Sequence, residues 1–159
     1  MLDGLNHKLF LEVFEEKYHQ CYRCELAKTR NNLVWGDGDA YSASTLILGE
    51  APGEDEDEQG VPFIGKSGSL LREYLNKAAW EKKEYFITNT VLCRPPNNRK
   101  PTMIESLACS SRLATVIECM DNLKLIICVG AVSMFSILGT KIMSGNMGLN
   151  KIPSPYAQT

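Results

Sequence analysis

Residues 45–71, TLILGEAPGEDEDEQGVPFIGKSGSLL, predict a strand, a loop and a helix in immediate succession. The apolar run at 46–48 is typical of a buried strand, and a turn rich in glycine, proline and acid follows it. An amphipathic helix is expected to begin near Ser67. In an open parallel sheet, ligands bind where loops leave the carboxyl ends of the strands. The residues expected at this place are Gly49, Glu50, Ala51, Pro52 and Gly53.

Two more buried strands are expected farther along the chain. Residues 85–91, YFITNTV, are rich in β-branched and aromatic side chains, and residues 125–130, LIICVG, form a third apolar run. Helical segments separate the three runs. This alternation predicts an α/β fold, a three-layer sandwich with a parallel central sheet and right-handed crossovers. The strand ends then bring Glu50, Asn89 and Gly130 to one edge.

The remaining segments are expected to be packing helices and loops. Apolar residues at helical spacing predict a helix over 3–19, and Thr102 with Glu105 forms the pattern of a helix capping box. A last helix is expected from about 131 to 138. Residues 139–159 are rich in Gly, Pro and Ser, and we expect them to form a loop. The acidic run at 54–58, with the exception of Glu56, is expected to be a solvated loop. Residues 27–44 are expected to form a loop or an irregular hairpin.

Composition indicates one globular domain over residues 1–159. The chain is 44% hydrophobic and 23% charged, which is ordinary for such a domain. Its net charge of −2 and pI near 5.7 argue against a protein that coats DNA without specificity, so any DNA binding must come from a local basic patch. No stretch approaches the roughly 18 apolar residues of a membrane span, and no signal segment is recognisable. A cytoplasmic protein is expected.

The six cysteines do not suit a disulfide framework in a chain of this kind. Cys21 and Cys24 form a CxxC pair that can bind one metal centre, although a pair of ordinary thiols or a surface redox pair has the same spacing. Cys119 and Cys128 lie in apolar surroundings and are simply explained as small buried hydrophobic residues.

Two polar features near the expected strand ends are open to two interpretations. Asn89 interrupts a buried strand, so it either ties a loop in place or binds a ligand that presents a donor and an acceptor. Gly65 and Gly68 would let a ligand phosphate approach the helix that begins near Ser67, or they serve only the geometry of the turn.

These residues together carry a family resemblance. The motif begins with GEAPG at 49–53 and continues through Gly60-x-Pro62-Phe63-x-Gly65-x-x-Gly68. It is followed by Ile-Thr-Asn at 87–89 and by Cys-Arg-Pro-Pro-x-Asn-Arg-x-Pro at 93–101. From about Cys21 to Gly139 the chain resembles the iron-sulfur uracil-DNA glycosylases of family four. It also resembles the related domain at the start of some phage-type DNA polymerases.

The resemblance implies a cofactor. In that family four cysteines hold a 4Fe-4S cluster, and their positions match Cys21, Cys24, Cys93 and Cys109. A zinc site is the alternative. Excision of uracil transfers no electrons, so the cluster is expected to be structural and to tie together the span between the first and last of these cysteines.

The resemblance also implies a mechanism. Phe63 would stack on a uracil flipped out of the DNA, and Asn89 would read its Watson-Crick edge by accepting from N3–H and donating to O4. Glu50 would position or polarise the attacking water, with Glu56 as a second carboxylate, and loop amides would meet the departing uracil anion. The expected phosphate contacts are Lys66, Ser67, Arg94 and Arg99.

One departure from the family pattern stands out. The family's His-Pro motif at the end of a fourth strand is not found, since His7 and His19 both precede the cysteine pair, and residues 152–155 carry Ile-Pro-Ser-Pro instead. We therefore expect a domain that is incomplete at its C-terminus and lacks the last strand.

Two hypotheses about function follow from the motif and its departure. The first is a monomeric uracil-DNA glycosylase, a hydrolase of N-glycosidic bonds that acts on uracil-containing DNA in base excision repair, with an activity impaired by the absence of the His motif. The second is a non-catalytic iron-sulfur module that binds nucleic acid or another protein, for example as part of a replication protein.

Overall fold

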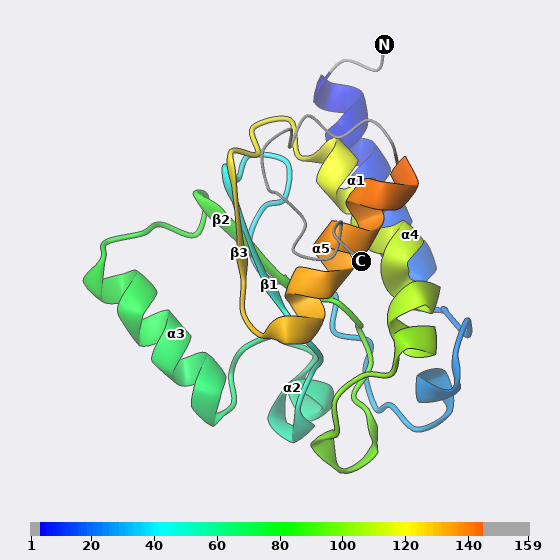
Figure 1. The fold of residues 1–159 in the computed structure, drawn as a ribbon. Coiled ribbons are helices and arrows are strands. Elements are labelled where there is room, and N and C mark those ends of the chain that lie inside the picture. Colours follow the sequence, from blue (N-terminus) through cyan, green and yellow to red (C-terminus); the bar gives the residue numbers. More distant parts are fainter. Residues whose placement is uncertain (1–3, 145–159) are drawn as a thin grey trace, which may run out of the picture.

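The computed structural model describes residues 4–144, and Figure 1 shows their arrangement. Three strands form a parallel sheet in the order β2-β1-β3: β1 is Thr45–Gly49, β2 is Tyr85–Asn89 and β3 is Leu125–Cys128. The predicted α/β fold with a parallel sheet is confirmed. The helices are α1 (Gly4–Tyr18), η1 (Glu25–Lys28), α2 (Glu54–Gln59), α3 (Lys66–Lys77), η2 (Pro96–Asn98), α4 (Met103–Cys119) and α5 (Ala131–Ser144).

Helices cover both faces of the sheet. Figure 1 shows α3 on one side and α1, α4 and α5 on the other. Ile47 and Ile87 point toward α3 and form a small apolar cluster with Leu75. Leu46 and Leu48 alternate with them and belong to the larger cluster on the opposite face. The sheet is therefore the middle layer of three, as its apolar strands require.

The register of the sheet aligns the strand ends at the predicted site. Gly49 at the end of β1 is the pairing partner of Asn89 at the end of β2, and Leu48 pairs with Cys128 of β3. Within residues 4–144, β3 pairs with β1 only and is partly exposed, with Leu125 at 48%. The central strand thus carries the loop that begins with Glu50.

Two segments expected to be loops are helical. The acidic run forms α2, because carboxylates at the start of a helix face the positive end of its dipole and Glu56 accepts a hydrogen bond from the Gly53 amide. Helix α5 continues through Gly139 to Ser144, six residues beyond its expected end. The Ile-Pro-Ser-Pro run at 152–155 and the question of a last strand lie outside the described residues. None of the described helices is long and apolar enough to cross a membrane.

The predicted capping box at the start of α4 is present. Thr102 Oγ1 accepts from the Glu105 amide at 3.2 Å, and Glu105 Oε2 accepts from the Thr102 amide at 2.8 Å. Both Glu105 oxygens also accept from the Arg99 guanidinium, at 2.9 and 2.7 Å. These hydrogen bonds, with that from Arg99 the largest cause, lower the pKa of Glu105 from 4.5 to about 2.

This carboxylate makes stability depend on pH. Because the folded pKa is depressed, its contribution is full above pH 4.5 and is lost as the pH falls toward 2. Glu105→Gln is expected to lower the free energy of unfolding at pH 7 by about 1 kcal/mol. Urea unfolding at intervals from pH 7 to pH 3 should show that the difference from wild type shrinks with pH. A difference that does not change with pH would contradict the assignment.

Candidate active site

A cavity of about 580 Å³ opens at the carboxyl ends of β1 and β2. It is bounded by the loop after β1, the start of α3 and the loop after β3. Most of the residues predicted for the site line it: Gly49, Glu50, Ala51, Gly53, Glu56, Phe63, Lys66, Ser67 and Asn89. Pro52 is buried next to them. Arg94 and Arg99 do not line this cavity, although Asn98 between them does.

Gly49 lies between the two side chains predicted to hold a base. A Cβ atom at this position would collide with Asn89 Oδ1 on one side and with the Phe63 ring on the other. Asn89 is 2% exposed, and its side chain forms no hydrogen bond with any other described residue. A buried amide without a protein partner is poorly explained as a structural tie. The geometry favours the interpretation of Asn89 as a ligand-binding residue.

Phe63 is held in an uncommon backbone conformation, with φ at 56°. Arg72 of α3 fixes it by donating to the carbonyls of Phe63 and Pro62 at 2.9 and 2.7 Å, and to Asp37 Oδ2 at 2.8 Å. Gly68 allows the start of α3 to lie against the Phe63 backbone, because a Cβ atom there would overlap it. The sequence did not reveal Arg72 and Asp37 as supports, since they are far apart in the chain and belong to no motif.

Gly68→Ala tests whether this packing positions the Phe63 ring. We expect destabilisation by about 1–3 kcal/mol, since the added methyl group forces the loop and helix apart. We also expect a rise of about tenfold in KM for uracil-containing DNA, the substrate that the family resemblance implies, because the stacking of a base is worth about 1–3 kcal/mol. Asn76→Ala, on the exposed face of α3, is the matched control. Unchanged KM in a folded Gly68→Ala protein would refute the positioning role.

Glu50 is fixed at the cavity wall. Its Oε1 accepts from the Val132 amide at the start of α5, at 3.1 Å. Gly130 has φ of 106°, and a side chain there would collide with the Glu50 side chain. The carboxylate of Glu50, which follows the central strand β1, is thus anchored by the loop after β3. A glycine at position 130 of that loop leaves the room that the Glu50 side chain needs.

Glu56 has a different environment from Glu50. Its Oε1 accepts from the amides of Ile64 and Gly65 at 3.0 and 2.7 Å, and its Oε2 accepts from that of Gly53 at 3.0 Å. Glu56 is buried, at 8% exposed. With three amides bound, this carboxylate holds the two ends of the cavity loop together. The contacts favour a structural role over that of a second catalytic carboxylate.

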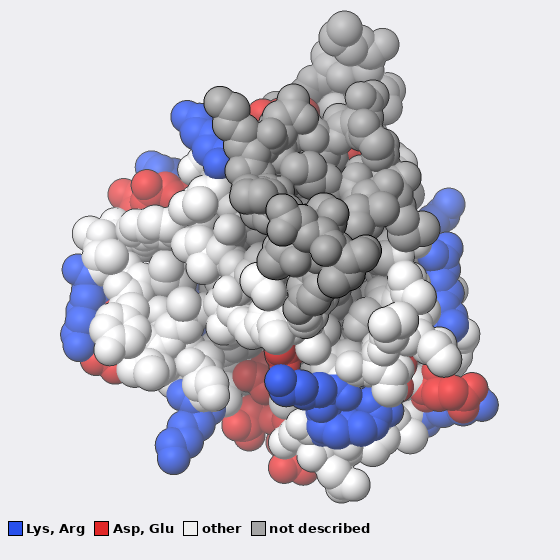
Figure 2. Space-filling model, viewed as in Figure 1, with Lys and Arg blue, Asp and Glu red and all other residues white. Residues whose placement is uncertain are grey.

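The basic residues predicted to bind DNA fall into two groups. Lys66 and Ser67 are exposed at the cavity mouth. Arg94 donates to Asn98 Oδ1 at 2.7 Å and lies 3.5 Å from Glu54, and Arg99 is bound to a carboxylate of α4. Figure 2 shows basic atoms beside acidic atoms at the edge where α2 lies. The local field is therefore mixed, as the net charge of the chain suggests.

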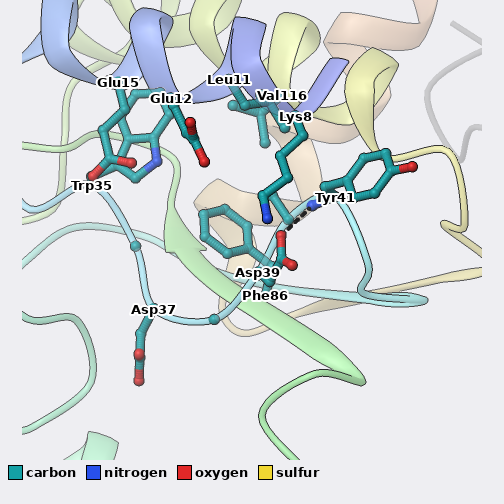
Figure 3. A pocket seen from close by; sticks show the side chains of 13 residues that line it. Lys8, Leu11, Glu12, Glu15, Trp35, Asp37, Asp39, Tyr41, Phe86 and Val116 are labelled. Atoms are coloured by element: carbon teal, nitrogen blue, oxygen red, sulfur yellow. Dashed lines mark hydrogen bonds between the residues drawn. The ribbon is translucent and has the colours of Figure 1, made fainter. Parts of the chain in front are cut away.

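A second cavity, of about 400 Å³, lies between α1 and the loop at 35–41. Figure 3 shows Lys8 reaching from α1 toward Asp39. The other charged groups that line this cavity are carboxylates: Glu12, Glu15 and Asp37. The first cavity is lined by as many carboxylates, Glu50, Glu54, Asp55 and Glu56, and by one lysine, so charge does not distinguish the two cavities. The first cavity is the better candidate for a ligand site because the carboxyl ends of parallel strands meet there.

The four predicted cluster cysteines approach one another beside the start of α4. Cys93 and Cys109 are buried in the larger core cluster, and Cys21 and Cys24 pack against it. Burial raises the pKa of Cys24, and nearby Cys109 and Cys21 raise it further. Burial also raises the pKa of Cys93 to about 11, against the lowering effect of a hydrogen bond from Arg30, and Cys109 and Cys24 add to the rise.

Among residues 4–144, no group of three or more His, Cys, Asp or Glu side chains is close enough to hold a single metal ion. Cys119 is buried and Cys128 half-buried, both in the apolar core cluster, as expected of small hydrophobic residues.

Comparison with known proteins agrees with the geometry. Residues 35–156 match the model of the uracil DNA glycosylase superfamily. The chain belongs to this superfamily. Three relatives named Type-4 uracil-DNA glycosylase confirm the predicted resemblance to family four of the superfamily. That of Thermotoga maritima is 38% identical over 133 residues, 83% of this chain and 68% of the relative.

Two further relatives of this chain carry the same name. That of Saccharolobus solfataricus is 44% identical over 109 residues, 68% of this chain and 50% of the relative. That of Sulfurisphaera tokodaii is 40% identical over 141 residues, 88% of this chain and 60% of the relative. The chain thus spans between half and about two thirds of the length of these curated glycosylases.

Proposed function

We propose that this chain is a uracil-DNA glycosylase, a hydrolase that removes uracil from DNA in base excision repair. The observation that carries the proposal is the meeting of Glu50, Phe63 and Asn89 in one cavity around Gly49. A ring, an amide and a carboxylate are the groups that stacking, base reading and water activation require. The names of the relatives support the same activity.

Base recognition rests on Asn89 and Phe63. The buried amide accepts from uracil N3–H and donates to O4, a pattern that cytosine does not match because its N3 carries no proton and its C4 carries an amino group. The Phe63 ring stacks on the flipped base and favours its place in the cavity over its place in the duplex. The backbone at both residues is held before the base arrives, at Phe63 by Arg72 and at Asn89 by the pairing of β2, so little ordering is needed on binding.

Hydrolysis of the glycosidic bond rests on Glu50. Its carboxylate, anchored at one oxygen by the Val132 amide, holds a water against the sugar carbon as the bond to uracil breaks. The negative charge that develops on uracil is met by amides of the loop after β1. The Gly53 amide is already donated to Glu56, so the donors lie elsewhere in residues 49–53.

We further propose that Cys21, Cys24, Cys93 and Cys109 hold a 4Fe-4S cluster. The four thiols gather around the core between the loop after α1, the loop after β2 and α4. When bound, the cluster supplies no redox step to the reaction and ties these segments together. The protons of the buried thiols are lost when the metal binds.

The proposed partner is uracil-containing DNA. Lys66 and Ser67 contact its phosphates at the mouth of the cavity, and Arg94 and Arg99 contact them only if they exchange their acidic partners for phosphate. The protein works as a monomer in the cytoplasm, where it can associate with replication proteins.

Incubation with a uracil-containing single-stranded oligonucleotide, followed by alkali to cleave abasic sites, tests the function. We expect cleavage by anaerobically purified wild-type protein and a loss of about 10²- to 10³-fold in Glu50→Ala. No histidine of residues 4–144 lines the cavity, so we expect a lower rate than that of a family member that has the His-Pro motif. A folded, iron-loaded protein that cleaves nothing would instead support a non-catalytic binding module.

A further inference from the structure

Arg112 is a fully buried guanidinium behind the candidate active site, at 1% exposed. It lies on α4 and reaches the end of β2. Its Nη2 donates to the carbonyls of Asn89 and Thr90 at 2.7 and 3.0 Å, and its Nη1 lies 3.5 Å from Thr88 Oγ1. Arg112 therefore binds the backbone carbonyls of the base-reading residue Asn89 and of the residue that follows it.

The contacts of Arg112 leave its charge unbalanced. The acceptors that it contacts at the end of β2 are two carbonyls and a hydroxyl, and none of them carries a charge. Its Nε has no hydrogen-bond partner in the described part of the chain. A guanidinium does not lose its proton in a protein, and a buried cation without an anion is strongly unfavourable. A source of negative charge must lie nearby.

The cysteine site is that source. Cys109 lies one helical turn before Arg112 on the same face of α4, and Cys93 lies a few residues beyond the end of β2. Burial lowers the pKa of Arg112, and Cys109, Tyr18 and, to a smaller extent, Cys93 raise it. Neutral thiols would not balance the guanidinium. Four thiolates outweigh the positive charge of an iron-sulfur core, so the loaded site is negative as a whole.

We propose that Arg112 is a positioning residue that couples the metal centre to base recognition: the thiolates on one side hold it in place, and it holds the Asn89 and Thr90 carbonyls on the other. The inference rests on the proposed function for its meaning and on the cysteine site for its charge. It gives the cluster a second effect beyond the stability of the fold. Loss of the metal centre leaves a buried unpaired cation, which pulls away from β2 and loosens the cavity edge.

Two backbone amides lie next to this contact, and their hydrogen exchange can be measured without any assay of catalysis. The Thr90 amide donates to the Gly49 carbonyl at 2.8 Å, and the Val91 amide donates to the Glu50 carbonyl at 3.1 Å. Hydrogen exchange of the peptide over residues 88–92, followed by mass spectrometry, measures how firmly these bonds are held. The exchange rate is compared between two samples: protein purified anaerobically, and the same protein after its iron has been removed with a chelator.

In wild type, iron removal is expected to raise exchange at these amides about tenfold. In Arg112→Met, exchange is expected to be high already and to respond little to iron. Arg30→Met is the matched control, because Arg30 donates to Cys93 Sγ at 3.2 Å but makes no contact with the end of β2. It should lose iron faster to the chelator yet keep the wild-type response. Arg112→Lys, which keeps the charge, should retain more iron than Arg112→Met.

Several outcomes would overturn the coupling. The first is that wild-type protein contains no iron. The second is that hydrogen exchange in Arg112→Met responds to iron removal as it does in wild type. The third is that exchange in wild type does not respond to iron removal. If Arg112→Met does not fold, equal iron retention and equal exchange in Arg112→Lys and wild type would also refute the role of the fork of donors. Because neither readout depends on uracil removal, a protein that shows the coupling but cleaves no DNA would refute the proposed function alone.

Discussion

Replacing Asn89 by alanine is expected to lower kcat/KM for uracil-containing single-stranded DNA by about two to three orders of magnitude. The buried amide has no protein partner for its side chain in residues 4–144, so both of its hydrogen-bonding atoms are available to the base. Alanine removes the acceptor for N3–H and the donor for O4, and each lost hydrogen bond in a dry cavity costs about 1–2 kcal/mol. The measurement is the initial rate of abasic-site formation over a range of substrate concentrations.

Two variants show whether the loss comes from base reading. Asn89→Asp keeps an acceptor for N3–H and loses the donor for O4, so its rate should fall below wild type. Asn122→Ala removes an exposed amide remote from the cavity and should leave the rate unchanged. If Asn89→Ala retained wild-type kcat/KM, the amide would be a structural tie after all, and the site would need another reader of the base.

The second large effect is expected from the cysteine site. Cys93→Ala should lower the iron content several-fold and the thermal unfolding midpoint by about 10 °C, which in a chain of this size corresponds to about 3 kcal/mol or more. Cys93 is buried at 5% exposed and joins the loop after β2 to the core. Loss of one thiolate therefore weakens a centre that ties three segments together. Iron analysis and thermal unfolding by circular dichroism measure the two effects.

Cys119→Ala is the control for this result. Cys119 is also buried, at 7% exposed, but lies at the end of α4 away from the four cysteines of the proposed centre. It should keep its iron and lose no more stability than one small core residue contributes, about 1 kcal/mol. A Cys93→Ala protein that retained wild-type iron, or a wild-type protein that stayed folded and equally stable after iron removal, would contradict a structural cluster.

Those parts of the fold that depend on the pattern of residues within a short segment could be predicted from the sequence. The runs at 46–48, 85–91 and 125–130 located the strands, and the capping residues Thr102 and Glu105 located the start of α4. Because parallel strand ends meet at one edge, the convergence of Glu50 and Asn89 also followed from the sequence. These features depend on short segments and on general rules of sheet geometry.

The parts that could not be predicted depend on contacts between distant segments. Arg72 supports Phe63 together with Asp37, and Arg112 crosses from α4 to the end of β2. No residue type or spacing in the sequence distinguishes these arginines from surface charges. Glu56 is expected to be a second carboxylate because of its place in the motif, and no pattern in the sequence predicts that three backbone amides bind it.

The position of β1 in the middle of the sheet has a consequence for folding. Its pairing partners begin at Tyr85 and Leu125, about 40 and about 80 residues farther along the chain. Closing such long loops is slow, so β1 pairs with its two neighbours late in folding. Glu50 forms its hydrogen bond with the Val132 amide only after β3 has paired with β1. During synthesis, Glu50 and Asn89 are added to the chain before β3 exists, so the cavity that contains both of them forms late. A nascent chain that has not passed about residue 132 therefore carries the motif without an organised cavity.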